Sequence, residues 1–331
     1  MSDATAFQPY RGARRRVAAL TALAAAAVVA VTVGVAVVQT DRHDPLPAAL
    51  VSPREGNPPL ALDLGVRTDA EAVALRNAAA LYEQGRLDEA LSVFERYDSL
   101  EARVGRAFAR WPERTTDRLV SLSGLHPSSA LVQLHLGIAL FWARRPGEED
   151  AWRAALAAAP DTSYAVTAEN LLFQGFAPDI PKFFPTVAIP GSAAGLRADE
   201  QLAAFERLAS GGDRAGTFFY GIALQELGRR VSAQRVLVAY ARRHPGDVEA
   251  QVAAAVSRFR KSDPAAAFSR LGPLTRRFPR AATVRFHLGL LLLWSGEVRE
   301  ARTQLERAVA DEPGSPAARE AMRYLDRLPK A

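Results

Sequence analysis

The chain has 331 residues, of which 49% are hydrophobic and 24% are charged, the values of a folded protein rather than a disordered one. It has no cysteine, which excludes disulfides, thiolate metal sites and a cysteine nucleophile. Its net charge of +6 is divided evenly, because residues 1–38 carry +3 and the rest of the chain carries the other +3. No clustered basic stripe appears, so we expect no nucleic-acid partner.

The first predicted element is a transmembrane helix over residues 17–38. This run contains no charged residue, and as a helix it would be about 33 Å long, enough to cross a hydrocarbon core of about 30 Å. Arg11, Arg14, Arg15 and Arg16 precede it, whereas the residues just after it carry no positive excess. The positive-inside rule therefore predicts a cytoplasmic basic tail over residues 1–16 and an extracytoplasmic location for everything after Val38.

Three other interpretations of this run remain open. A cleaved signal peptide would have a shorter apolar region, and the best cleavage site, Gly34-Val35-Ala36, lies inside the run. A twin-arginine signal would start at Arg15-Arg16, but no strong consensus follows. A buried helix of a soluble domain is the third, although a run without a polar face suits a globular surface poorly. The expected localisation is thus the cell membrane, with a single pass.

Residues 39–70 are predicted to form a linker. Pro45, Pro47, Pro53, Pro58 and Pro59 interrupt any helix, and no sustained hydrophobic period is present. Such a segment forms a semi-extended tether, although parts such as Leu60-Ala61-Leu62 could also dock on the following domain.

A 34-residue period follows in residues 214–315. Pro245, Pro279 and Pro313 are 34 residues apart, and small or apolar residues recur at fixed distances before each of them. The positions assigned to repeat packing are Gly137, Gly221, Ala233, Pro245, Ala267, Pro279, Gly289, Ala301 and Pro313. Small residues let two antiparallel helices approach closely, and the prolines end the second helix of each pair. Gly228 and Gly296 fall between the paired helices, where a left-handed C-cap is needed.

This period resembles the tetratricopeptide repeat, of the membrane-anchored bacterial type. The resemblance implies an all-α fold in which helix hairpins form a superhelical solenoid after the transmembrane helix. Residues 71–161 are expected to hold earlier, partly degenerate repeats, with 98–128 the least regular. Residues 162–213 are expected to hold one helix and an insertion, residues 214–315 three repeats, and residues 316–329 a capping helix that begins with Ser315 as N-cap and Pro316.

The insertion, residues 175–195, contains four prolines and several large apolar residues. A loop of this length inside a compact domain is usually functional or packed down. We expect Phe183, Phe184 and Ile189 to lie against the solenoid, partly over its groove. The competing expectation is a mobile loop beside an open groove.

No catalytic or cofactor motif is present: GxSxG, P-loop, GxGxxG and HExxH are all missing. His135 and His287 occupy equivalent places beside leucines, where a packed histidine is expected rather than a catalytic one. We therefore expect no enzyme, no cofactor and no metal.

The resemblance implies a concave groove lined by the first helix of each repeat, which binds a protein or peptide segment. The groove residues carried over to this chain are Phe141, Trp142, Phe218, Ile222, Phe259, Phe286, Leu290, Leu293 and Trp294. They form an apolar, aromatic set, although about half of them would be core residues between repeats. The expected function is a membrane-tethered protein–protein interaction or assembly module. The alternatives are an envelope enzyme with a site near residues 175–195, and a cytoplasm-facing adaptor if the topology is inverted.

Overall fold

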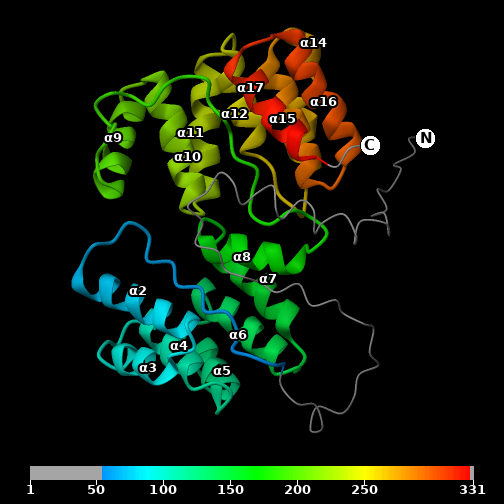
Figure 1. Ribbon diagram of the computed structural model, residues 1–331. Helices are drawn as coiled ribbons and strands as arrows, with labels where there is room; N and C mark the ends of the chain where they lie inside the picture. Colours follow the sequence, from blue (N-terminus) through cyan, green and yellow to red (C-terminus); the bar gives the residue numbers. More distant parts are fainter. Residues whose placement is uncertain (1–53, 329–331) are drawn as a thin grey trace. The chain divides into compact units, whose positions relative to one another are not determined.

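Every regular element of residues 54–328, the residues described by the computed structural model, is a helix (Figure 1). The predicted transmembrane helix over residues 17–38 and the first part of the predicted linker lie outside these residues. Among the helices of residues 54–328, none has the length and apolarity needed to cross a membrane.

The described residues divide into two compact units. The α6 unit comprises residues 54–172 and 188–236, and the α15 unit comprises residues 173–187 and 237–328. The helices of the α6 unit are α2 (Ala70–Glu83), α3 (Leu87–Phe94), α4 (Leu100–Ala109), α5 (Thr115–Leu125), α6 (Ala130–Trp142), α7 (Glu148–Ala158), α8 (Ser163–Leu172), α9 (Ala198–Ser210) and α10 (Arg214–Glu226). The helices of the α15 unit are α12 (Val248–Val256), α13 (Ala265–Leu271), α14 (Leu274–Arg277), α15 (Ala282–Trp294), α16 (Val298–Asp311) and α17 (Pro316–Arg327). The helix α11 (Arg230–Arg243) begins in the first unit and ends in the second.

Helix starts are fixed by short polar side chains. The Asp69 carboxylate accepts the backbone N–H of Ala72 at the start of α2, and the Ser129 hydroxyl accepts that of Val132 at the start of α6. Ser315 does the same for α17, where Pro316 occupies the first turn as predicted. These bonds satisfy N–H groups that have no partner inside the helix.

The turns between paired helices use glycine where the backbone must be left-handed. Gly228 has a φ of 69° and Gly296 a φ of 80°, which agrees with the C-cap role predicted for both. Gly85, between α2 and α3, has a φ of 76°. Only glycine adopts this region without a steric penalty, so these positions fix where each hairpin turns.

The paired helices approach closely where one of them carries glycine. A Cβ on Gly137 of α6 would lie 2.4 Å from the Trp152 ring of α7. A Cβ on Gly289 of α15 would lie 2.9 Å from Leu305 and 3.2 Å from the Ala301 carbonyl oxygen of α16. These separations are shorter than van der Waals contact, so a side chain at either glycine would force the paired helices apart.

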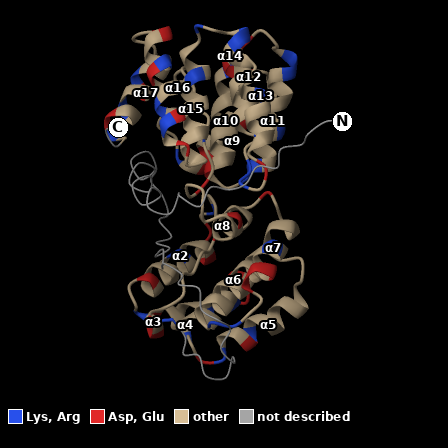
Figure 2. Cartoon of the chain, turned by 90° about the vertical axis from the view of Figure 1, so that its right-hand side faces the viewer, with Lys and Arg blue, Asp and Glu red and all other residues tan. Residues whose placement is uncertain are grey.

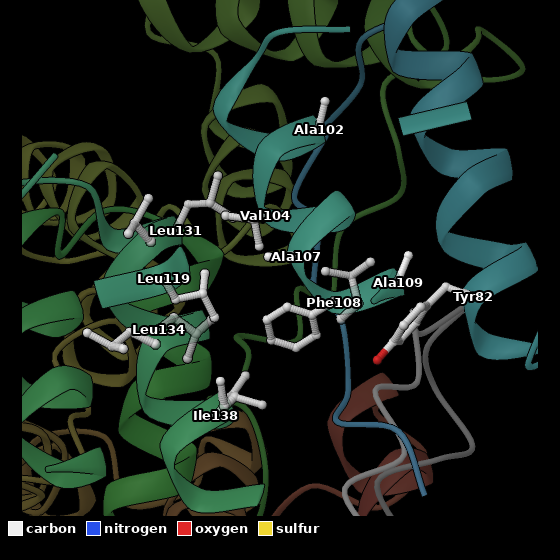
Figure 3. Packing of buried hydrophobic residues seen from close by; sticks show 14 of the residues in the cluster. Tyr82, Ala102, Val104, Ala107, Phe108, Ala109, Leu119, Leu131, Leu134 and Ile138 are labelled. Atoms are coloured by element: carbon white, nitrogen blue, oxygen red, sulfur yellow. The ribbon is translucent and has the colours of Figure 1, made fainter. Parts of the chain in front are cut away.

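Each unit has its own apolar core. In the α6 unit, Phe108 of α4 is fully buried and points toward Leu119, Leu134 and Ile138 (Figure 3). In the α15 unit, Ala301, Leu305 and Ala308 of α16 are all fully buried against α15 and α17. Residues 98–128, the least regular part of the sequence, form the α4–α5 hairpin in the core of the α6 unit.

The middle repeat of residues 214–315 departs from the predicted helix pair. Its second helix is divided, because α13 ends at Leu271 and α14 begins at Leu274. Pro273 stands at the break and offers no backbone N–H to continue the ladder from α13. The repeat therefore keeps its buried residues, Ala267 and Leu271, without a continuous second helix.

Candidate functional site

A proline-rich segment, residues 54–64, runs along α6 without forming a helix; we call it the first strap. Leu60 and Leu64 are buried in the core of the α6 unit. The Tyr82 hydroxyl of α2 donates to the Pro58 carbonyl oxygen over 2.6 Å. The end of the predicted linker therefore docks on the helical domain, which was one of the two outcomes expected for it.

The first strap is bound at its centre by a buried histidine. The Ala61 backbone N–H donates to Nε2 of His135, 3.2 Å away. The other ring nitrogen, Nδ1, lies 2.7 Å from the Leu131 carbonyl oxygen and must carry the proton to make that bond. His135 has no exposed surface, and this burial lowers its pKa to about 4. The imidazole is therefore neutral, with Nε2 free to accept.

The start of the first strap is bound by the C-terminal end of α6. The Arg54 backbone N–H donates to the Trp142 carbonyl oxygen over 2.7 Å. The Arg54 guanidinium donates through Nε to the Phe141 carbonyl oxygen over 3.0 Å and lies 3.8 Å from the centre of the Phe141 ring. The last carbonyl groups of a helix have no partner within it, so the strap supplies donors that α6 lacks. We call His135, Phe141 and Trp142 the α6 site.

The α15 unit contains an equivalent segment, residues 177–187, which we call the second strap. The Phe184 backbone N–H donates to Nε2 of His287 over 2.9 Å, and Nδ1 of His287 lies 2.7 Å from the Thr283 carbonyl oxygen. His287 is also fully buried, and burial lowers its pKa to about 4. The Ala177 backbone N–H donates to the Trp294 carbonyl oxygen over 3.1 Å.

Two aromatic contacts add to the second strap. The Phe183 ring stacks on the His287 imidazole with a centroid distance of 5.1 Å. The Phe184 ring meets the edge of Phe286 at 5.8 Å. Phe286, His287 and Trp294 form the α15 site. The prediction that Phe183 and Phe184 lie against the repeats is confirmed.

The two straps bind in the same register. In each, the residue that bonds the tryptophan carbonyl lies seven positions before the residue that bonds the histidine: Arg54 and Ala61 in one, Ala177 and Phe184 in the other. The third position has a positive φ in both, 76° at Gly56 and 61° at Asp179. The fifth position is a buried proline, and the seventh is a buried apolar residue. Both straps therefore bind in the same way to the same kind of helix.

The predicted groove residues are not exposed as a continuous surface. Phe218, Phe259, Phe286, Leu290 and Leu293 are buried, whereas Phe141, Trp142, Ile222 and Trp294 are partly buried. This agrees with the expectation that about half of them are core residues between repeats. Part of the reason for their burial lies in the straps, because Phe184 covers Phe286 and Phe176, just before the second strap, meets Phe259.

Ile189 does not lie against the repeats. Its side chain is 48% exposed, so this part of the expectation for the insertion is wrong. The last bond from the second strap to the helices is made by Thr186, whose backbone N–H donates to the Glu249 carboxylate over 2.6 Å. Beyond Ile189 the insertion packs again, because Ala193 is fully buried beside Phe205 and its carbonyl oxygen accepts a bond from the Gln201 side chain of α9.

The positions assigned to repeat packing lie in two environments. The small residues Gly137, Gly221, Ala233, Ala267, Gly289 and Ala301 are buried. The repeat-ending prolines Pro245, Pro279 and Pro313 are exposed between helices.

The sequence analysis missed the two histidines as strap-binding residues. Leu134-His135-Leu136-Gly137 and Phe286-His287-Leu288-Gly289 are nearly the same motif at equivalent places, and this recurrence was the available signal. Hydrophobic spacing alone does not distinguish a histidine packed in a core from one that accepts a bond from another segment.

Charged residues of both signs are interspersed along the helices of each unit (Figure 2). One pocket of the α6 unit does collect four arginines, Arg103, Arg106, Arg110 and Arg118, which sequence spacing had not indicated. Two of them face carboxylates, because Arg110 pairs with Glu95 at 2.5 Å and Arg106 with Asp98 at 3.6 Å. Within residues 54–328, no group of three or more acidic or histidine residues could hold a metal ion.

Comparison with known proteins gives one finding on the family. Residues 258–325, from the end of α12 to α17, match the tetratricopeptide repeat family. A search among curated proteins found no match to the chain. Repeats of this family generally mediate protein–protein interactions, and the helix hairpins of both units are consistent with such a repeat. The matched part of the chain thus supports its description as a tetratricopeptide repeat protein.

Proposed function

We propose that the chain is a membrane-tethered protein–protein interaction or assembly module whose helical repeats face the extracytoplasmic side. The observation that carries the interaction role is the pair of straps. Helices α6 and α15 each bind an extended segment through its backbone, and this is the contact that a groove-binding partner would make.

The tether is supported by the sequence of residues 1–38. An uncharged run of membrane-spanning length follows four arginines, and the residues after it carry no positive excess. This charge asymmetry favours a cytoplasmic N-terminus. The first strap begins sixteen residues after Val38, so the helical domain would lie close to the membrane surface.

An interaction role also agrees with the chemistry of the two sites. Each offers a neutral imidazole acceptor, a helix-terminal carbonyl and aromatic side chains. Such groups bind a peptide backbone and apolar side chains. Neither site brings together a nucleophile, a base and an oxyanion donor, which acyl-transfer catalysis requires.

A reporter that is active only outside the cytoplasm, fused after Ala331, tests the topology. We expect activity, and a mature chain that retains residues 1–38. A soluble chain that begins near Val37 would contradict the tether. An inactive reporter on a membrane-bound chain would instead indicate a cytoplasm-facing adaptor.

Crosslinking in intact membranes, followed by affinity capture, tests the interaction. The chain should be captured with a protein whose crosslinks map to α6 or α15. The matched control is a Glu306→Ala chain, altered at an exposed position of α16 that belongs to neither site. Crosslinks that avoid both helices would contradict the assignment of the binding sites.

A further inference from the structure

The two straps share a backbone geometry but very little sequence. Aligned by their hydrogen bonds, residues 54–61 (REGNPPLA) and residues 177–184 (APDIPKFF) have one identical residue, the proline at position five. The binding sites, by contrast, are closely alike: a histidine and a tryptophan seven residues later on one helix. Each site binds one strap, and what the two bound sequences share is a pattern of a few positions.

We infer that the α6 site is a receptor for this pattern, and that a partner protein presents it as an extended segment with glycine, asparagine or aspartate at position three, proline at five and a large apolar residue at seven. Positions one and eight must carry a backbone N–H. This inference rests on the interaction role proposed above and specifies the partner of that site.

Each position has a physical reason. A positive φ at position three is open to glycine and is adopted by asparagine and aspartate more readily than by other residues. Proline at position five can be buried without leaving an N–H group unpaired, and it keeps the preceding residue extended. Position seven is Leu60 or Phe183, both nearly fully buried. Position eight donates to the histidine, so proline is excluded there.

The α6 site holds its strap with the smaller side chains. Positions seven and eight are Leu60 and Ala61 in the first strap, whereas they are Phe183 and Phe184 in the second. The first strap therefore removes less apolar surface from water at these two positions. The indole Nε1–H of Trp142 is buried without a hydrogen-bond partner among residues 54–328, and the same holds for Trp294 in the α15 site. A partner with phenylalanine at position seven and a carbonyl near Trp142 would bind better than the first strap does.

The occupant we assign is a partner protein rather than a second copy of the chain. Exchange of first straps between two copies would replace each contact by the same contact. It would gain no new interaction and would lose the freedom of two separate molecules. A segment of a different protein that fits the α6 site better would gain contacts that the first strap does not make.

The test uses the full-length chain and a synthetic probe, the acetylated peptide of residues 174–188 with a fluorescent label at its C-terminus. This peptide carries the pattern of the second strap, with phenylalanine at positions seven and eight. Binding is measured by fluorescence anisotropy. The protein variant is Leu60→Ala, which loosens the first strap, and its control is Glu55→Ala, an exposed position of the same strap.

Leu60→Ala should bind the peptide at least tenfold more tightly than the unaltered chain, because truncation of a buried leucine weakens the competing strap. Glu55→Ala should bind it as the unaltered chain does. If Leu60→Ala fails to fold by circular dichroism, the milder Leu60→Val replaces it, with an expected tightening of two- to fivefold. Equal affinity for the loosened and unaltered chains would overturn the inference.

A second probe tests the histidine directly. The same peptide with an N-methyl group on its Phe184 lacks the N–H that donates to the imidazole, and it should bind at least tenfold more weakly. Unchanged binding would show that the hydrogen bond from this backbone N–H to the imidazole does not contribute to recognition. Self-association of Leu60→Ala, detected by sedimentation and blocked by the peptide, would make a second copy the occupant and also overturn the inference. Failure of the topology reporter would leave these peptide results unaffected, so the two proposals fail separately.

Discussion

Acidification should destabilise the protein in a pH window set by the two strap-binding histidines. His135 and His287 are fully buried, and burial lowers the pKa of each to about 4. In the unfolded chain each pKa returns to about 6.5. Protonation of the native protein would place a charge in the core and would turn the Nε2 acceptor into a donor facing a strap N–H. The two histidines of the native state therefore remain neutral at pH values at which those of the unfolded chain are protonated.

The sign and size of the effect follow from linkage. Above pH 6.5 both states are neutral at these histidines, so their full contribution to stability is present. Between pH 6.5 and 4 the unfolded chain binds one more proton per histidine, so stability falls as the pH falls. The slope approaches about 1.4 kcal/mol per pH unit for each histidine. From pH 6 to pH 5 we expect a loss of about 1 kcal/mol per histidine, or about 2 kcal/mol in total.

The Asp69 carboxylate affects stability at lower pH than the histidines do. Bonds from the Arg67 guanidinium and the Ala72 backbone N–H lower the pKa of Asp69 to about 2, so its contribution is lost as the pH falls from about 4 to 2. A decline between pH 6 and 5 therefore reports on the histidines rather than on this cap.

Urea unfolding at pH 7, 6 and 5 measures the decline. His287→Gln keeps an acceptor for the Phe184 N–H but does not titrate, so it should lose about half of the decline between pH 6 and 5. His244→Gln alters an exposed histidine and should keep the whole decline. The hydrogen-exchange protection factors of residues 54–64 and 177–187, corrected for the intrinsic exchange rate at each pH, should fall over the same range. If His287→Gln and the unaltered chain decline equally, the histidine does not hold the strap in the way described.

Two packing predictions use matched pairs. Gly137→Ala should destabilise the α6 unit by about 1–3 kcal/mol through overpacking, whereas Gly124→Ala, which meets nothing within 4 Å, should stabilise α5 by about 0.5–1 kcal/mol. Ala301→Leu should cost about 1–3 kcal/mol because Ala301 is fully buried, and Glu297→Ala should change stability by less than about 0.5 kcal/mol. Urea unfolding checks all four, and equal shifts within either pair would contradict the assigned helix packing.

The helix hairpins could be predicted because their information is local and periodic. Gly289 and Ala301, twelve residues apart, meet across one turn, and Gly296 marks that turn. A 34-residue recurrence of such positions fixes helix, turn and contact face together. The break in the middle repeat could also have been predicted, because Pro273 stands inside the expected second helix. The regular 34-residue period on either side of it favoured a continuous helix instead.

The straps could be predicted only in part, because their partners are distant in the chain. Ala61 and His135 are 74 residues apart, and Phe184 and His287 are 103 residues apart. Apolar content suggested that the insertion packs down, and Phe183 does so. Composition gave no register, however, so it could not separate Phe183, which is buried, from Ile189, which is exposed.

The prolines that exclude a helix from both straps are also what allows the straps to be buried. An extended segment in a sheet needs a partner for nearly every backbone N–H, and a helix surface offers few acceptors because its own carbonyls are already bonded. Pro58 and Pro59 in the first strap, and Pro178, Pro181 and Pro185 in the second, remove donors that would otherwise need partners. One helix-terminal carbonyl and one imidazole nitrogen then suffice to bind positions one and eight. A partner segment without proline would bring unpaired donors to the same surface, and we therefore expect these two helices to bind proline-containing segments and to reject regular strands.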